Sequence, residues 1–163
     1  MVLRLLLVLI GPAALLASSG FVLARTPEGY AANLAALYSE HQWVLAARET
    51  CNMALPQGQG EIDGAFGLWR ERNKELIDDL EARLAALVRS ASKDQRDYSR
   101  NYARSQSEVL QQREEERKRL LSRPRTELQQ LCGDLPGYLR DPRSDLPNRA
   151  PEEYAAIYRK GSP

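Results

Sequence analysis

Apolar side chains recur at steps of three and four along the first part of the chain, from residue 26 to residue 55. Such steps place side chains on one face of an α-helix, so we expect a helix over 26–55. Its stripe is narrow and suits a helical bundle or a coiled-coil seam. The stripe consists of Tyr30, Leu34, Leu37, His41, Val44, Cys51 and Leu55.

A second and clearer stripe covers residues 61–90, after the connector "LPQGQGE". Pro56, Gly58 and Gly60 in this connector favour a turn. The following residues again step by three and four, and the intervening positions are mostly charged, so we expect a second helix over 61–90. This stripe consists of Ile62, Phe66, Trp69, Asn73, Leu76, Leu80, Leu84 and Leu87.

Residues 93–121 are highly polar and carry only a thin apolar stripe. Ser92 followed by Gln95 fits a capping box, which predicts the start of a third helix there. A continuous helix with a bend is the alternative, because no Gly or Pro separates the two segments. We expect the third helix to project from the core or to pack along a narrow seam.

Pro124 interrupts this helix, and we expect a short helix that ends at Gly133, a favourable stop. The Pro-rich residues 134–163 then predict an extended tail that packs on the bundle and ends in a short helix at 151–159. The apolar residues expected to attach this tail are Leu135, Tyr138, Leu139 and Leu146.

No segment has the alternation typical of a strand, so the predicted fold class is all-α. We expect an elongated helical hairpin or three-helix bundle over residues 25–133, followed by short C-terminal helices.

The N-terminus has the features of a secretory signal peptide over residues 1–24. A short basic head, "MVLR", precedes the apolar run "LLLVLIGPAALL", and Val22 and Ala24 are small residues before a cleavage site. We therefore predict an exported protein, periplasmic or extracellular, without stable membrane insertion after cleavage. The alternative is an uncleaved anchor over residues 5–24, since about 20 apolar residues span a bilayer.

The sequence contains two cysteines, Cys51 and Cys132. In an exported protein an even pair predicts one disulfide, and two buried free thiols are the alternative. Metal binding is not expected, because the cysteines lack paired ligand spacing and His41 is the single histidine.

Charge and motifs argue against several functions. The chain carries 23 Lys and Arg against 22 Asp and Glu, and this balance gives no support for nucleic-acid binding. His41 would need a distant partner such as Ser105 or Cys132 to act as a base, and we interpret it as an interior histidine. The acidic runs at residues 78–79 and 114–116 fit solvated helix faces. We expect neither enzymatic activity nor a cofactor.

Trp69 and Asn73 lie one turn apart on the second apolar stripe, in "FGLWRERN". One interpretation is a tight helix crossing with a buried Asn73 bonded to neighbouring backbone. The other is a partner-binding groove with Trp69 at its floor, in which Asn73, Arg70 and Phe66 also contact the partner.

These features resemble two groups of exported helical proteins. The early Cys51, the "FGLWRERN" segment and the late "LQQLCG" resemble uncharacterised small exported proteins of proteobacteria, which share a Trp-x-x-Arg-Asn-like motif between two cysteines. "RTELQ" at 125–129 is similar to the Leu-Thr-x-x-Gln motif of periplasmic stress chaperones, with Arg125 in place of the leucine. The second likeness implies a helical hairpin that dimerises into a cradle.

The sequence therefore predicts a non-catalytic, exported helical protein that binds another protein or an envelope component. A periplasmic chaperone-like or stress-adaptor protein that binds unfolded clients is the alternative. A homodimer is left open.

Overall fold

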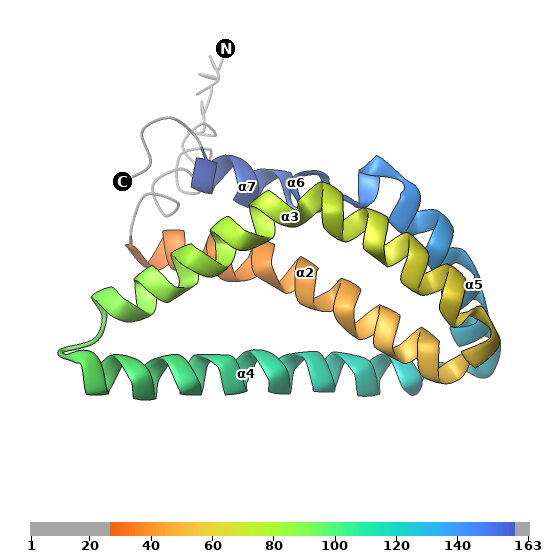
Figure 1. The fold of residues 1–163 in the computed structure, drawn as a ribbon, viewed down its shortest axis with the longest axis horizontal. Helices are drawn as coiled ribbons and strands as arrows, with labels where there is room; N and C mark the ends of the chain where they lie inside the picture. Colours follow the sequence, from red (N-terminus) through yellow and green to blue (C-terminus); the bar gives the residue numbers. More distant parts are fainter. Residues whose placement is uncertain (1–26, 159–163) are drawn as a thin grey trace, which may run out of the picture.

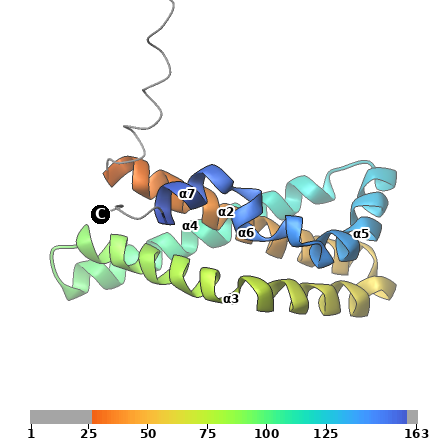
Figure 2. The same ribbon diagram turned by 90° about the horizontal axis from the view of Figure 1, so that it is seen from above.

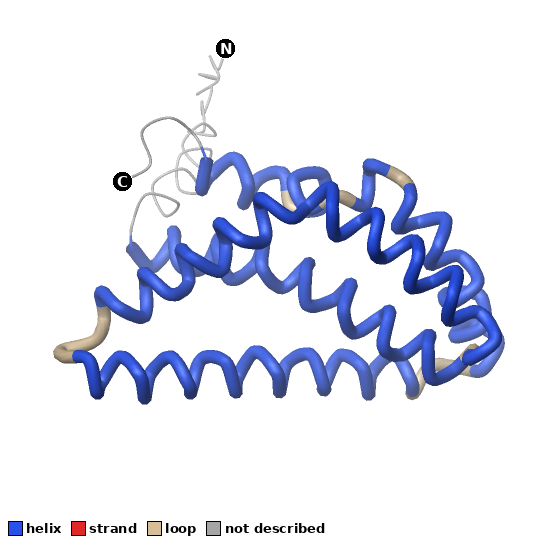
Figure 3. The backbone as a smooth tube through the Cα atoms, viewed as in Figure 1, coloured by secondary structure: helices blue, strands red, loops and turns tan. Residues whose placement is uncertain are grey.

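The computed structural model describes residues 27–158, and within that range the chain is all-α without a strand (Figure 3). The predicted signal peptide and the alternative membrane anchor both lie outside the described residues. The elements are α2 (Pro27–Ala54), η1 (Pro56–Gly58), α3 (Gln59–Ser90), α4 (Gln95–Leu121), α5 (Arg125–Arg140), η2 (Pro142–Ser144), α6 (Leu146–Arg149) and α7 (Pro151–Tyr158).

The long helices α2, α3 and α4 form an elongated frame, in which α3 and α4 meet at one end (Figure 1). The chain turns through α5 at the other end, and α6 and α7 then run back along the bundle (Figure 2). Helix α2 contacts each of the other α-helices, so it forms the centre of the fold. The predicted helices over 26–55 and 61–90 are confirmed with shifts of one or two residues at their ends.

Helices α3 and α4 are separate, so the alternative of one bent helix is wrong. The side chain of Asp94 caps α4 by accepting a hydrogen bond from the backbone N–H of Asp97 at 2.8 Å. The predicted cap, Ser92, instead donates its hydroxyl to the carbonyl of Val88 at 2.6 Å and so belongs to the end of α3. Asp is as good a cap residue as Ser, so the sequence alone did not distinguish Asp94 from Ser92.

The prediction that helix α5 ends at Gly133 is wrong. The helix continues to Arg140 and has Pro136 inside it. Leu135 and Leu139 lie beyond Gly133 and are buried in the core. Burying the two leucines contributes about 2 kcal/mol each. This offsets most of the cost of about 1 kcal/mol for each glycine and about 3 kcal/mol for the proline inside the helix.

The C-terminal segment is likewise not an extended tail, because most of it is helical. Pro142, Pro147 and Pro151 each lie in the first turn of a short helix, where a missing N–H costs nothing. Leu146 is fully buried, as its predicted role in attaching this segment requires, and Ile157 of α7 is buried as well.

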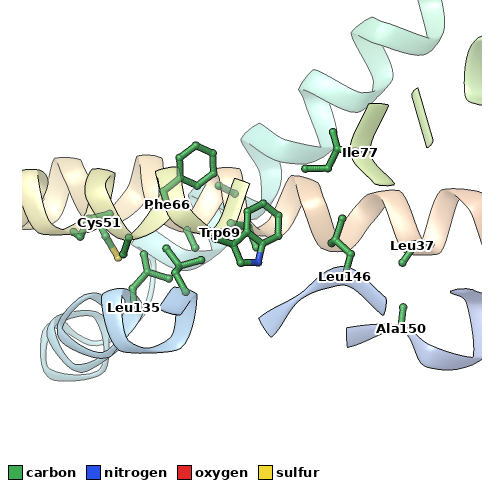
Figure 4. Packing of buried hydrophobic residues seen from close by; sticks show 14 of the residues in the cluster. Leu37, Cys51, Phe66, Trp69, Ile77, Leu135, Leu146 and Ala150 are labelled. Atoms are coloured by element: carbon green, nitrogen blue, oxygen red, sulfur yellow. The ribbon is translucent and has the colours of Figure 1, made fainter. Parts of the chain in front are cut away.

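The core lies between α2, α3 and α5, and α6 and α7 cover its far end (Figure 4). Helix α4 contributes a single buried residue, Leu120, so it packs through a narrow seam as its thin stripe predicts.

The predicted disulfide is present. Cys51 at the end of α2 is bonded to Cys132 in α5, with a Cα–Cα distance of 5.1 Å. Both cysteines are buried in the core, and the bond links elements 81 positions apart in sequence. It therefore joins the first helix of the described chain to the start of the C-terminal segment.

Candidate functional site

Trp69 is buried at the centre of the core, between aromatic neighbours. Its ring stacks on those of Phe66 and His41, with centroid distances of 6.1 Å in both cases. Its indole N–H donates to the backbone carbonyl of Ser144 at 3.0 Å. Trp69 thus binds the C-terminal segment of its own chain (Figure 4).

Asn73, one turn further along α3, makes hydrogen bonds to three backbone or side-chain groups. Its Nδ2 donates to the carbonyl of Trp69 at 2.8 Å and to Oδ1 of Asp145 at 3.1 Å. Its Oδ1 accepts from the backbone N–H of Leu146 at 2.9 Å. The amide therefore fixes the first turn of α6 against α3.

Arg72 makes further hydrogen bonds between α3 and the residues before α6, and we call this contact the α3–α6 junction. Arg72 donates to Oδ1 of Asp145 at 2.9 Å and to the carbonyl of Leu139 at 2.8 Å. Arg72 belongs to the Trp-x-x-Arg-Asn-like motif of the sequence. Sequence reasoning missed Asp145, because its charge looks like one of many solvated ones until the fold brings positions 73 residues apart together.

The four residues predicted to contact a partner are therefore divided between core and surface. Phe66, Trp69 and Asn73 are buried, whereas Arg70 is exposed on α3. The arrangement of Asn73 matches the interpretation of a buried Asn bonded to neighbouring backbone.

His41 is buried between Tyr38 and Trp69, as the interior interpretation requires. Burial lowers its pKa to about 4, with further lowering by the positive charges of Arg113 and Arg70. The imidazole is therefore neutral near pH 7. Its Nδ1 has no hydrogen-bond partner among the described residues, and Cys132, one of its conceivable partners, is in the disulfide.

A groove of about 280 Å³ lies between α2, α4 and α6. We call it the α2–α4 groove. Its lining residues are Ser39, Glu40, Gln42, Trp43, Gln112, Arg113, Glu116 and Arg149.

One wall of the groove is aromatic and rigid. Trp43 is partly buried and packs edge-to-face on Tyr138, with 5.8 Å between ring centroids. The guanidinium of Arg149 lies 5.8 Å from the centroid of the Trp43 ring and also pairs with Glu40 at 3.1 Å. The position of Trp43 is therefore fixed by three elements, α2, α5 and α6.

Gln42 lies at the groove and is only 8% exposed. Its Oε1 is buried without a hydrogen-bond partner among the residues that the structure describes. Buried polar groups are almost always paired, and one left unpaired costs about 1–3 kcal/mol. The oxygen is an acceptor, so only a hydrogen-bond donor could satisfy it.

The groove residues were not singled out by the sequence pattern. Trp43 lies next to Val44, outside the apolar stripe of its helix. A tryptophan outside the stripe was the one sequence feature that could have indicated the groove. Arg113 and Arg149 come from segments 36 positions apart and have no motif around them.

Residues 27–158 hold no group of three or more His, Cys, Asp or Glu side chains arranged for a metal ion. Within the same range, no helix is long and apolar enough to cross a bilayer.

Comparison with protein-family models, curated proteins and solved structures finds no match for this chain. The resemblances to small two-cysteine exported proteins and to periplasmic stress chaperones therefore stay predictions.

Proposed function

We propose that this chain is a non-catalytic, exported helical protein that binds another protein or an envelope component through the α2–α4 groove. The observation that carries the proposal is a partly buried Trp43, in contact with Tyr138 and Arg149, in the same groove as Gln42, whose Oε1 is buried without a hydrogen-bond partner among the described residues. Trp, Tyr and Arg side chains in well-packed pockets dominate the binding energy of protein interfaces. Trp43 and Arg149 are residues of this kind.

Export is supported by the buried disulfide and by the signal peptide that the sequence predicts over residues 1–24. Disulfides persist in oxidising compartments and are rare in the cytosol. A periplasmic location is accordingly part of the proposal.

Affinity capture from a native envelope extract without reductant tests the proposal. The wild-type chain is compared with Trp43→Leu, which keeps an apolar side chain beside Tyr138, and with Leu68→Ser as a matched control. Leu68 is exposed on α3 and outside the groove. We expect a dominant partner that Leu68→Ser retains and Trp43→Leu loses.

Equal capture by all three proteins would place the binding surface elsewhere and reject the groove. The chaperone-like alternative is separated by a second assay on the same proteins. A chaperone would suppress aggregation of an unrelated unfolded client at near-stoichiometric ratio, whereas a specific binder would not.

A further inference from the structure

We propose that the α2–α4 groove receives the C-terminal carboxylate of the bound partner, and that Arg113 is the residue that recognises it. Trp43 would pack against the apolar part of the same partner residue. This inference rests on the proposed function and adds the chemistry of the group that enters the groove.

Arg113 lines the groove, and the N–H donors of its guanidinium are not engaged in hydrogen bonds within the described part of the chain. Its side chain is 23% exposed, and its nearest carboxylate is that of Glu49 at 3.8 Å, which is too long for a hydrogen bond. Within the described part of the chain its guanidinium makes no hydrogen bond. An arginine side chain carries five N–H donors in a planar fork that fits a carboxylate bidentately.

The acidic residues of the groove are already engaged. Glu40 accepts two hydrogen bonds from Arg149 at 3.1 and 3.2 Å. Glu116 accepts two from Arg119 at 2.6 and 2.7 Å. Because their charges are compensated by these pairs, the groove offers an entering group the free donors of Arg113 rather than a free carboxylate.

The nature of the anion follows from the same neighbours. A phosphate dianion needs more than one cation to compensate its charge, and Arg149, the other cation of the groove lining, is already paired with Glu40. A carboxylate carries a single charge and needs one guanidinium, which Arg113 supplies. The exposed Gln112 borders the same groove, and its amide N–H₂ group can donate to the carboxylate.

The size of the groove indicates a residue of a partner rather than a large ligand. Pockets for drug-sized ligands and cofactors occupy about 300–1,000 Å³, and a volume of about 280 Å³ lies just below that range. One or two side chains of a protein partner fit this space.

Titration followed by NMR tests the inference on the intact protein. The probe is N-acetyl-phenylalanine, which carries a carboxylate and an apolar ring, and its neutral control is N-acetyl-phenylalanine amide. We expect the acid to shift the indole N–H signal of Trp43 and the Nε–H signal of Arg113. The amide should bind at least about tenfold more weakly, because it forms no charge-assisted hydrogen bonds.

Three variants sharpen the test. Arg113→Gln should lose the preference for the acid, Arg113→Lys should keep part of it, and Arg104→Gln should leave it unchanged. Arg104 is a matched control, since it is exposed on the same helix and does not line the groove. Equal binding of acid and amide, an unaltered preference in Arg113→Gln, or no binding at the groove would each overturn the inference.

Failure of the inference can be told from failure of the proposed function. If affinity capture of the partner depends on Trp43 but Arg113→Gln captures it as well as the wild type, the groove is the binding site and the carboxylate assignment is wrong. Preferential binding of phenylethylamine would likewise overturn it, since Glu40 and Glu116 would then determine the charge of the partner.

Discussion

The indole N–H of Trp69 donates to the backbone carbonyl of Ser144 at 3.0 Å, across 75 positions of sequence. Both residues are fully buried. This bond joins α3 to the turn between α5 and α6, and the neighbouring amide of Asn73 fixes the residues that follow. The C-terminal segment is therefore part of the core, and Arg149 of the groove is held in place through it.

Truncating Trp69 should destabilise the whole protein. Trp69→Ala removes a fully buried ring and should lower the free energy of unfolding by about 3–5 kcal/mol. Trp69→Phe keeps most of the ring packing but leaves the carbonyl of Ser144 unpaired, and should cost about 1–3 kcal/mol. Urea denaturation measures both. A stable Trp69→Ala variant that has lost its partner would instead restore Trp69 as a contact residue.

Asn73→Ala should be destabilising through hydrogen bonds rather than volume. It leaves the buried N–H of Leu146 unpaired and removes a donor to Asp145, so we expect a loss of about 2–4 kcal/mol. Lys74→Ala is the matched control, because Lys74 is exposed and its pair with Asp78 is a surface one. Such pairs contribute under about 1 kcal/mol. Similar losses in both variants would contradict the account of the α3–α6 junction.

Removing the disulfide should have a large effect. The loop between Cys51 and Cys132 spans 81 positions, for which the loop-entropy model gives about 4.5 kcal/mol. The double variant Cys51→Ser with Cys132→Ser should lose stability of this order in thermal or urea unfolding. Mass spectrometry under non-reducing conditions gives an independent check, and two free thiols in the purified protein would refute the bond.

Lowering the pH should destabilise the protein because His41 takes up a proton more readily in the unfolded chain. This effect should begin at a higher pH than the protonation of the carboxylates. The pKa of His41 is about 4 in the folded protein, below its usual value of about 6.5 in an unfolded chain. Between these values the unfolded chain binds more protons, so stability is complete above about pH 6.5 and falls as the pH is lowered toward 4. The full effect is up to about 3 kcal/mol.

The single histidine of the sequence makes this test specific. Unfolding measured at several pH values between 5 and 7 should show a slope in the wild type that His41→Gln lacks. The carboxylates with lowered pKa, such as Asp63 and Asp141, titrate below this interval. An equal slope in the two proteins would show that His41 is not buried as described.

Much of the fold was predictable because periodicity reports directly on burial. The stripes of α2 and α3 and the polar character of α4 follow from positions along one helix at a time. The extension of α5 past Gly133 was not predictable in this way, since it depends on how deeply Leu135 and Leu139 pack against other helices.

The candidate site was predictable only in part, for the same reason. The sequence singled out Trp69 and Asn73 as unusual, but their hydrogen bonds to Ser144 and Leu146 are long-range and have no local signature. The α2–α4 groove arises where residues from α2, α4 and α6 meet, and only the three-dimensional arrangement brings Trp43 and Arg113 together.

Site-specific photo-crosslinking in the native envelope tests the central claim most directly. A photoreactive residue is placed at Gln112, in the groove, and in a second protein at Arg70, exposed on α3 outside the groove. We expect a single dominant adduct from position 112 and none of that mass from position 70. An adduct from position 70 alone would show that the partner binds near the sequence-predicted residues, and would contradict the assignment of the groove.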